Sequence, residues 1–306
     1  MNYNSPKSIQ DILSTHGLAL QKKFGQNFLI SKDVREHILS VIDIDPGSAV
    51  PAQATGMSRR SAGVNIWEIG PGLGNMTALI LEKMEALCHE HGKEGKLFVF
   101  EIDKGFIKIL KNLFVSKIEV IEGDFIKTWK KHKEAAGMPD RIFGNLPYNS
   151  ASLIIAALIE ENSVPEKMVF TVQKEAAQRI AAKPGTKDYS SFSILCQIAC
   201  NIKIEADIKG GAFFPVPDVT SSLISMTPHN KYAGIKDRKL FSRFLRTIFQ
   251  ARRKTILNNL KIVASTETIT NILRQENIPP TIRAEALEIS QIVSLFERIS
   301  GCIYTI

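Results

Sequence analysis

The sequence predicts an α/β protein in which a mostly parallel sheet is followed by a small all-α domain. Between residues 64 and 230, short apolar runs alternate with longer stretches of helical periodicity, as in βαβ units with helices on both faces of a sheet. A linker rich in Pro, His, Asn and Gly follows at Thr227–Gly234, and the pattern after it is helical. We therefore predict one domain at residues 1–230 and a second at residues 231–306.

Seven runs of apolar, β-forming residues are the predicted strands. In chain order they are Val64–Ile69, Leu97–Glu101, Ile118–Ile121, Arg141–Phe143, Lys167–Val172, Ile202–Ile208 and Ser222–Met226. The last two have no clear long helix between them, so we expect an antiparallel pair at one edge, joined through the Pro-rich turn at Phe213–Pro217. Pro46–Gly63 and Lys130–Pro139 have no apolar period and are interpreted as surface insertions.

The segment Lys239–Leu260 has the spacing of an amphipathic helix, with apolar residues at i, i+3, i+4, i+7 and i+8 from Phe241. Basic residues recur on the opposite face, at Lys239, Arg243, Arg246 and Arg253. Such a stripe can neutralise phosphates while the apolar face packs on the rest of the protein.

The formal charge of +8 is concentrated near the C-terminus. Residues 1–230 contain 26 Lys and Arg against 25 Asp and Glu, whereas residues 231–306 contain 13 against 6. A near-neutral body with one strongly basic segment indicates a partner that carries a phosphate backbone. A solvated lysine-rich face is the alternative, and charge alone does not separate the two.

Composition excludes several classes of protein. Of the 306 residues, 44% are hydrophobic and 23% are charged, which is typical of a globular chain rather than a disordered one. No apolar run approaches the roughly 18 residues that a bilayer-spanning helix needs, and the first residues lack the pattern of a secretory signal. The four cysteines have neither C-x-x-C spacing nor the density of a disulfide framework. We therefore expect a cytoplasmic protein without membrane association.

The most specific single feature is a glycine-rich stretch, Trp67–Gly74, directly after the first predicted strand. Glycines at the carboxyl end of a strand allow a tight turn and a close approach to a ligand. The spacing from Glu68 is E-x-G-x-G-x-G, which differs from the G-x-G-x-x-G of dinucleotide-binding proteins, and no Walker Lys-Ser/Thr pair follows. Taken alone the stretch is weak evidence, because a purely structural turn can have the same residues.

Acidic residues follow the next two predicted strands. Glu101-Ile102-Asp103 ends the second strand and Gly123-Asp124-Phe125 follows the third. Because the carboxyl ends of parallel strands meet at one edge of a sheet, we expect Gly70, Glu101 and Asp124 to form one pocket, in which an acid accepts hydrogen bonds from ribose hydroxyls. The combination indicates a nucleoside site, although each acid alone would more often be a solvated turn residue.

The fourth predicted strand leads into Asn145-Leu146-Pro147-Tyr148. The exocyclic amino group of adenine is a poor nucleophile because its lone pair is delocalised into the ring. The Asn145 side-chain oxygen and the Leu146 carbonyl can hold its N–H groups and favour a pyramidal nitrogen, whose lone pair then points at an electrophilic methyl group. Pro147 has no N–H to compete, and Tyr148 offers a face for the base. Alone, the tetrad would also suit a strand-to-helix turn with a packed tyrosine.

In combination, these motifs resemble those of the ribosomal RNA adenine N6,N6-dimethyltransferases, and among them the A-type dimethylases, whose substrate is the RNA of the small ribosomal subunit. The resemblance covers nearly the whole chain, and several motifs in one order are far more specific than any one of them. They are Lys23–Leu29, EIGPGLG from Glu68, EID from Glu101, GDF from Gly123, GNLPYN from Gly144, Gln173–Glu175, Phe213–Val219, FQARRKT from Phe249 and Arg283–Glu285.

The resemblance implies a seven-stranded, Rossmann-like S-adenosylmethionine-dependent methyltransferase sheet, a helical RNA-binding domain, and an N-terminal segment, residues 1–30, that covers cofactor and RNA. The implied cofactor is S-adenosyl-L-methionine. The positions that match the family's cofactor-binding residues are Asn27, Leu29, Gly70, Glu101, Asp124 and Asn145. The catalytic loop matches Asn145, Leu146, Pro147 and Tyr148, and the residues implied to contact the substrate are Tyr148, Phe213, Arg252, Arg253 and Lys254.

The implied substrate is a pair of adjacent adenosines in the loop of the 3′-terminal hairpin of small-subunit (16S) rRNA. Each would receive two methyl groups during biogenesis of the 30S particle, and we expect the enzyme to be a monomer. Two departures from the family pattern are a longer insertion at Pro46–Gly63 and Thr220, where the family commonly has Asp.

Three alternatives are weighed against this reading. The related large-subunit rRNA adenine dimethylase, of the macrolide-resistance type, shares the chemistry, but GPGLG, NLPY and FQARRKT favour the small-subunit enzyme. A non-catalytic ribosome-assembly factor would not need the intact loop Asn145–Tyr148. An NAD-dependent oxidoreductase would need G-x-G-x-x-G and a proton-relay residue, and neither is found. Cys88-His89-x-His91 has no second Cys or His group nearby, so no metal site is predicted.

Overall fold

The computed structural model describes residues 2–20, 25–45, 63–92 and 94–303. For residues 301–303 it describes the backbone alone. Lys23 and Phe24 of the N-terminal motif, and nearly all of the predicted insertion at Pro46–Gly63, lie outside the described residues. Contacts divide the chain into two compact units. Unit 1 comprises Met1–Ile154, Val164–Ala177 and Asn201–Pro228, and unit 2 comprises Ile155–Ser163, Gln178–Cys200 and His229–Ile306.

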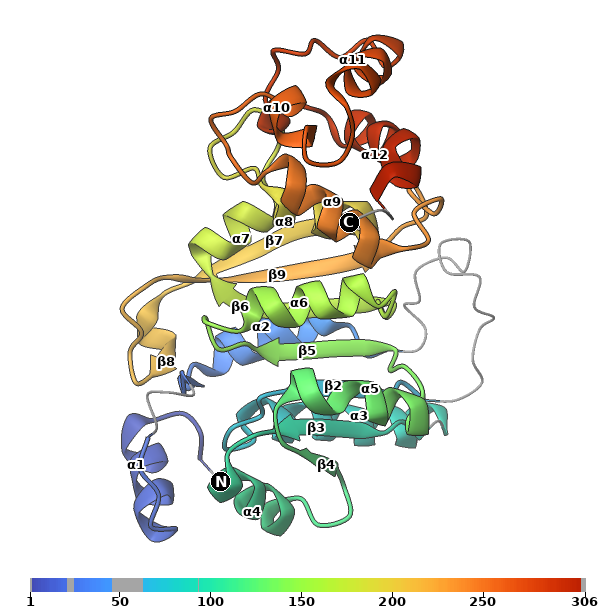
Figure 1. Ribbon diagram of the computed structural model, residues 1–306. Helices are drawn as coiled ribbons and strands as arrows, with labels where there is room; N and C mark the ends of the chain where they lie inside the picture. Colours follow the sequence, from blue (N-terminus) through green and yellow to red (C-terminus); the bar gives the residue numbers. More distant parts are fainter. Residues whose placement is uncertain (1, 21–24, 46–62, 93, 304–306) are drawn as a thin grey trace. The chain divides into compact units, whose positions relative to one another are not determined.

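Unit 1 is built on a seven-stranded sheet with the order β4-β3-β2-β5-β6-β9-β7 (Figure 1). The strands are β2 (Ile66–Ile69), β3 (Leu97–Glu101), β4 (Glu119–Glu122), β5 (Arg141–Asn145), β6 (Lys167–Gln173), β7 (Cys200–Ile208) and β9 (Ser221–Pro228). Strands β2 to β6 pair in parallel, and β9 is antiparallel to β6. All seven predicted strands are present, which confirms the predicted fold class.

The predicted edge pair is also found, because β9 and β7 are hydrogen-bonded neighbours at one end of the sheet. Ser222 Oγ donates to Asp207, and Ser225 Oγ donates to Glu205. Residue numbers rise along one strand and fall along the other, so the two strands are antiparallel.

Several helices of unit 1 begin at residues whose side chains accept backbone N–H bonds. Ser31 caps the helix after β1, Asp103 the helix after β3, and Asp124 the helix after β4. The helices are α1 (Pro6–Thr15), α2 (Lys32–Ile42), α3 (Asn75–His91), α4 (Lys104–Leu113), α5 (Phe125–Ala136), the 3-10 helix η3 (Gly210–Ala212) and the first residues of α6 (Ala151–Glu160) and α7 (Lys174–Ile180). The insertion predicted at Lys130–Pro139 is therefore wrong up to Ala136, because α5 continues to that residue and buries His132.

The two faces of the sheet bury different side chains. Val99 and Phe143 lie on one face, in an aliphatic cluster with residues of α2 and α3. On the other face, the rings of Trp67 and Phe100 contact Phe125 of α5, with centroids 6.4 Å and 4.9 Å apart. Helix α5 therefore covers the face opposite to α2 and α3, as Figure 1 shows.

A second, two-stranded sheet ties the N-terminal segment to unit 1. Strand β1 (Phe28–Leu29) pairs antiparallel with β8 (Phe213–Phe214), which lies in the turn between β7 and β9. Helix α1 adds Ile9 and Leu13 to a cluster that includes Phe106 of α4. The sequence did not predict this pairing, because two-residue strands carry no readable hydrophobic period.

Unit 2 is built from helices. Besides the remaining parts of α6 and α7, they are α8 (Ser191–Ala199), α9 (Arg238–Ile248), α10 (Ile256–Leu260), α11 (Thr266–Gln275), the 3-10 helix η4 (Ala284–Ala286) and α12 (Ile289–Ile303). The single helix predicted over Lys239–Leu260 is wrong, since α9 ends at Ile248 and α10 begins at Ile256. Asn259 Nδ2 donates to the Ile248 carbonyl at 2.7 Å, which satisfies a carbonyl that the end of α9 leaves open.

Because Arg253 lies in the turn between α9 and α10, it does not share a helical face with Lys239, Arg243 and Arg246. The boundary predicted at residue 230 stays a prediction, and unit 2 includes two segments that precede it. No helix within the described ranges is long and apolar enough to cross a membrane.

Candidate active site

A cavity of about 360 Å³ lies in unit 1 at the carboxyl ends of the parallel strands, which is where open α/β sheets bind ligands. Its walls come from residues 25–29, the glycine-rich turn after β2, and the residues that follow β3, β4 and β5. The cavity brings together every residue predicted to bind the cofactor: Asn27, Leu29, Gly70, Glu101, Asp124 and Asn145.

The glycine-rich turn forms one wall of the cavity. Gly70 has a φ of 70° and Gly72 a φ of 58°, a region that residues with a Cβ rarely adopt. A Cβ on Gly72 would also lie 2.9 Å from the ring of Phe28. Position 72 therefore needs glycine both for its backbone conformation and for the close approach of the N-terminal segment.

Glu101 is buried at the end of β3, and its carboxylate organises two turns. Oε1 accepts hydrogen bonds from the backbone N–H of Ile102 and of Asp103, both at 2.8 Å, and Oε2 accepts from Gly72 N at 3.1 Å. Burial raises the pKa of Glu101 to about 7, although the backbone hydrogen bonds oppose this shift. Oε1 uses both of its lone pairs in its two backbone hydrogen bonds, but Oε2 has a further lone pair, so Glu101 can still accept a ribose hydroxyl in the cavity.

A second buried carboxyl, Glu68, also lines the cavity. Thr77 Oγ1 donates to Glu68 Oε2 at 2.7 Å. Burial raises the pKa of Glu68 to about 8, the Thr77 bond lowers it, and the charge of Glu101 raises it further. Glu68 is therefore largely protonated at neutral pH and places little negative charge beside Glu101.

Asp124 has a structural use as well as a position in the cavity wall. Its Oδ1 accepts a hydrogen bond from Ile126 N at 3.0 Å and caps α5. Asp103 does the same for α4, where Gly105 N donates to its Oδ1 at 2.8 Å. Helix capping thus explains in part why acidic residues follow β3 and β4.

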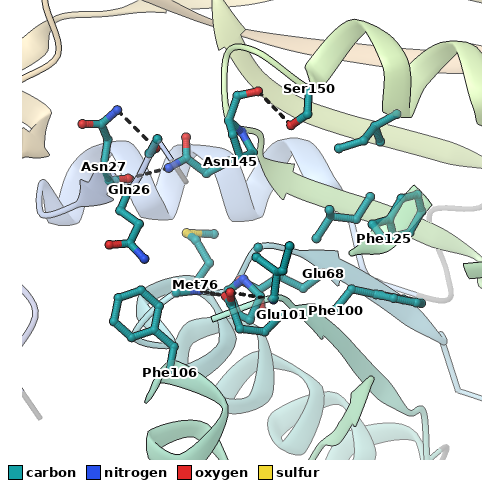
Figure 2. Close-up of a pocket in the computed structure, with 18 of the residues that line it drawn as sticks. Gln26, Asn27, Glu68, Met76, Phe100, Glu101, Phe106, Phe125, Asn145 and Ser150 are labelled. Atoms are coloured by element: carbon teal, nitrogen blue, oxygen red, sulfur yellow. Dashed lines mark hydrogen bonds between the residues drawn. The ribbon is translucent and has the colours of Figure 1, made fainter. Parts of the chain in front are cut away.

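Asn145 is held at the end of β5 by a backbone contact. Its Nδ2 donates to the backbone oxygen of Asn27 at 2.7 Å. Figure 2 shows this amide directed toward Asn27, with Glu101 on the other side of the cavity. Since only the amide nitrogen can donate to a carbonyl, Oδ1 remains as an acceptor for an incoming N–H group.

The other residues of the tetrad have different environments. Leu146 is buried, and its N–H donates to the Thr171 carbonyl at 3.1 Å. Pro147 lines the cavity. Tyr148 is half-buried, and its hydroxyl shares a 2.7 Å hydrogen bond with Ser221 Oγ. Burial raises the pKa of Tyr148, so its hydroxyl stays neutral at physiological pH.

Phe213 does not present a free ring. Its side chain is 1% exposed, belongs to the aliphatic cluster under the sheet, and pairs through its backbone with Leu29. The neighbouring Phe214 is half-buried and pairs with Phe28. Stacking of a base on Phe213 requires this turn to move, and that role stays a prediction.

The basic residues predicted to contact RNA lie in unit 2. Arg252, Arg253 and Lys254 are exposed in the turn between α9 and α10. Arg252 Nη2 lies 3.1 Å from Glu285 Oε2 and donates to the Lys187 carbonyl at 2.8 Å. Arg252 therefore has a structural role in bracing the turn. Its contact with RNA stays a prediction.

Two cations of α9 are also paired within unit 2. Lys239 Nζ lies 2.8 Å from Glu161 Oε1, and Arg246 Nη2 lies 3.1 Å from Glu160 Oε1. Arg243 is exposed on the same helix. Part of the basic segment thus stabilises the helical unit itself.

The cavity wall suits S-adenosyl-L-methionine in its chemistry. Glu101 Oε2 can accept a ribose hydroxyl, and Ile102 and Phe125 offer apolar surface for a base. Asn75 Nδ2 donates to the Leu29 carbonyl at 2.9 Å, while its Oδ1 is buried without a partner among the described residues. A buried, open amide oxygen fits the ammonium group of an amino-acid ligand.

Sequence reasoning missed several polar residues of this wall, among them Asn75 and Gln26. Gln26 stands inside the N-terminal motif, directly before Asn27, and Asn75 directly follows the glycine-rich turn, so proximity to a motif was the available signal. Over the described ranges, no cluster of His, Cys, Asp and Glu is suited to hold a metal ion.

Curated proteins of similar sequence cover nearly the whole chain. A ribosomal RNA small subunit methyltransferase A from Treponema denticola is 41% identical over 294 residues, which are 94% of this chain and 92% of that protein. A protein of the same name from Borreliella afzelii is 39% identical over 262 residues, 85% of this chain and 82% of that protein. A third, from Halothermothrix orenii, is 33% identical and covers 95% of this chain and 92% of that protein.

Two crystal structures share the fold. A dimethyladenosine transferase from Plasmodium falciparum has a TM-score of 0.69 at 20% identity and covers 89% of this chain and 97% of that chain. The 23S rRNA methyltransferase ErmE has a TM-score of 0.58 at 18% identity and covers 89% and 99%. The profile of the family described as ribosomal RNA adenine dimethylase matches residues 17–300. With the sequence identities above, this match shows that the chain belongs to the ribosomal RNA adenine dimethylase family.

Proposed function

We propose that this protein transfers methyl groups from S-adenosyl-L-methionine to N6 of two adjacent adenosines in the 3′-terminal hairpin loop of small-subunit (16S) rRNA. The products are N6,N6-dimethyladenosines, formed during biogenesis of the 30S particle. The observation that carries the proposal is the position of Asn145, whose Oδ1 is left as an acceptor at the edge of a cavity that Glu101 lines from the other side. Family membership and the names of the relatives support the reaction and the RNA.

The chain's own residues bind and orient the reactants. S-adenosyl-L-methionine supplies a methyl group on a positively charged sulfur. In the first transfer, Asn145 Oδ1 and the Leu146 carbonyl accept the two N–H groups of the adenine, which favours a pyramidal nitrogen with an available lone pair. In the second transfer one N–H remains, and one of the two acceptors holds it. After transfer the nitrogen is cationic and releases a proton to water, so no strong general base is required. The contribution of Asn145 is preorganised, because its amide is already fixed by Asn27.

The target adenosine must leave its stack to reach the cavity. Loop adenosines in RNA can be splayed out and stacked on aromatic side chains. Tyr148 is the candidate for one face of the base, since Ser221 fixes its hydroxyl, and Phe213 is the candidate for the other after movement of its turn. Arg253 and Lys254 would neutralise phosphates.

We further propose that the protein acts as a monomer in the cytoplasm. The large-subunit dimethylase is the nearest alternative, since the crystal structure of a 23S rRNA methyltransferase shares the fold. The names of the curated relatives, at up to 41% identity, favour the RNA of the small subunit. A non-catalytic assembly factor is the alternative of another class.

Transfer of a radiolabelled methyl group tests the proposal. The protein is incubated with labelled S-adenosyl-L-methionine and either purified, unmethylated 30S particles or naked large-subunit rRNA, and the product nucleoside is identified. We expect label in N6,N6-dimethyladenosine from the 30S particle alone. Label in the large-subunit rRNA would support the first alternative, and binding to the 30S particle without transfer would support the second.

A further inference from the structure

Residues 25–29 line the cavity, and three contacts fix them there. Gln26 Nε2 donates to Asp103 Oδ2 at 2.9 Å. Asn27 accepts a hydrogen bond from Asn145 through its backbone oxygen. Beyond them, β1 pairs with β8. Figure 2 shows Gln26 and Asn27 side by side, with the Gln26 side chain directed away from Asn145 and toward Phe106.

Asp103 is a firm anchor for Gln26. Its side chain is 5% exposed, and its Oδ1 accepts from Gly105 N at 2.8 Å. Its backbone N–H donates to Glu101 Oε1. Because the bond from Gln26 uses the other carboxylate oxygen, it ties the N-terminal segment to the turn that holds Glu101.

The contact with Asn27 selects one of two orientations of the Asn145 amide. Rotation of that amide by half a turn would exchange Oδ1 and Nδ2 and place two carbonyl oxygens against each other. An oxygen has no hydrogen to donate, so the reversed orientation loses the hydrogen bond and adds repulsion. The Asn27 carbonyl therefore keeps Nδ2 on its own side and leaves Oδ1 for the substrate.

We infer that Gln26 is a positioning residue for methyl transfer, whose hydrogen bond to Asp103 holds the Asn27 carbonyl against Asn145 and so keeps Asn145 Oδ1 directed at the substrate amino group. The inference rests on the proposed function, because it assumes that Asn145 accepts the reacting N–H. Although Gln26 lines the cavity, in this role its amide is bonded to Asp103 and it acts through its neighbour in the chain.

A set of four variants tests the inference. Gln26→Ala removes the bond to Asp103, and Gln26→Glu sets two carboxylates against each other. When Gln26→Glu is combined with Asp103→Asn, the amide nitrogen introduced at position 103 can donate to the carboxylate introduced at position 26, while the remaining oxygen at position 103 still caps α4. Gln10→Ala, at an exposed position of α1, is the matched control on the same segment. Single-turnover and steady-state methylation of 30S particles are measured for each.

We expect Gln26→Ala to lower kcat by about tenfold, as for a hydrogen bond to a charged group, with a smaller change in KM for the particle. Gln26→Glu should be slower still, and the double variant should recover most of the loss. Hydrogen exchange of the backbone amides of residues 28–30 should be faster in Gln26→Ala than in Gln10→Ala, with equal melting temperatures.

Wild-type kcat in Gln26→Ala would overturn the inference, as would a double variant no faster than Gln26→Glu. A fall in melting temperature that accounts for the lost rate would assign Gln26 a purely structural role and would also overturn it. If the wild-type protein transfers no methyl group to 30S particles, the proposed function fails and this inference fails with it. Active wild-type protein with unaffected Gln26 variants overturns the inference alone.

Discussion

At the scale of single residues, Asn145 makes the sharpest distinction between an enzyme and an RNA-binding protein. Its side chain is short and polar and lies at the end of β5, bonded through Nδ2 to the Asn27 carbonyl. Asn145→Ala removes the acceptor for the reacting amino group without opening a hydrophobic cavity. We expect methyl transfer to slow by roughly 10²–10³, as when one preorganised hydrogen-bond partner is removed. Single-turnover methylation of 30S particles measures this rate.

The same Asn145 variant should keep its fold and most of its RNA affinity, which a melting curve and a binding titration check. Asn145→Asp keeps an acceptor but loses the donor to Asn27 and adds charge, so we expect partial activity at best. Transfer at the wild-type rate by Asn145→Ala would show that the catalytic loop is misidentified.

Glu68 should make the stability of unit 1 depend on pH. Its pKa is about 8 in the folded protein against an ordinary value of 4.5, so the folded state binds more protons between these values. The contribution of Glu68 to the free energy of unfolding therefore falls as the pH rises from about 4.5 to 8. Glu68→Gln keeps an acceptor for Thr77 and removes the titration, so the variant should be more stable than wild type at pH 8, by on the order of 4 kcal/mol, and much closer to wild type near pH 5.

Urea unfolding at pH 5 and pH 8 measures this effect through tryptophan fluorescence, because both tryptophans, Trp67 and Trp129, lie in unit 1. Glu134→Gln, at an exposed position of α5, is the control and should leave the pH dependence unchanged. Equal pH dependence in Glu68→Gln and wild type would show that Glu68 is ionised in the folded protein.

At the scale of elements, the turn between α9 and α10 is braced by Arg252, whose guanidinium contacts Glu285 and the Lys187 carbonyl. We expect Arg252→Ala to destabilise the helical unit by about 0.5–1 kcal/mol, since exposed ion pairs contribute little. The salt dependence of RNA binding should change less in Arg252→Ala than in Arg253→Ala. Circular dichroism melting of Arg252→Ala, Glu285→Ala and the double variant measures the interaction energy between the two side chains.

The opposite pattern for Arg252→Ala, with unchanged melting and a flatter salt dependence, would support the direct RNA contact that the sequence predicts for Arg252. The contact with Glu285 would then be incidental to stability.

At the scale of the whole molecule, the basic C-terminal region predicts salt-dependent binding of RNA. Arg253→Ala with Lys254→Ala should lower the slope of log affinity against log salt by roughly 1.4–1.8, because each lost phosphate contact removes about 0.7–0.9. Fluorescence anisotropy with the 3′-terminal hairpin RNA at several salt concentrations measures this slope, and S-adenosyl-L-methionine affinity should stay constant.

The matched control removes the same formal charge from paired cations. Lys239→Ala with Arg246→Ala disrupts the ion pairs with Glu161 and Glu160 and should change the slope less. Equal slopes for the two double variants would mean that overall charge, rather than particular residues, governs binding.

Much of this protein is determined by sequence patterns that act locally. Seven short runs of apolar, β-forming residues predicted the seven strands, and β3 has the predicted bounds, Leu97–Glu101. A parallel sheet brings the carboxyl ends of its strands to one edge. For that reason Gly70, Glu101 and Asp124 could be assigned to one pocket before any contact was known, and all three line the cavity. Asn145 was assigned to the same site through the family resemblance, and it lines the cavity as well.

Tertiary structure alone decided how loops far apart in the chain meet. The bond from Asn145 to the Asn27 carbonyl, the pairing of Leu29 with Phe213 and the bracing of Arg252 by Glu285 each join residues that no periodic pattern connects. Such contacts depend on the paths of irregular segments, which carry no hydrophobic period. Phe213 is buried and Arg252 is paired as a result of these contacts. Which partner a side chain takes depends on which neighbours lie within reach, and the neighbours are fixed only when the whole chain is packed.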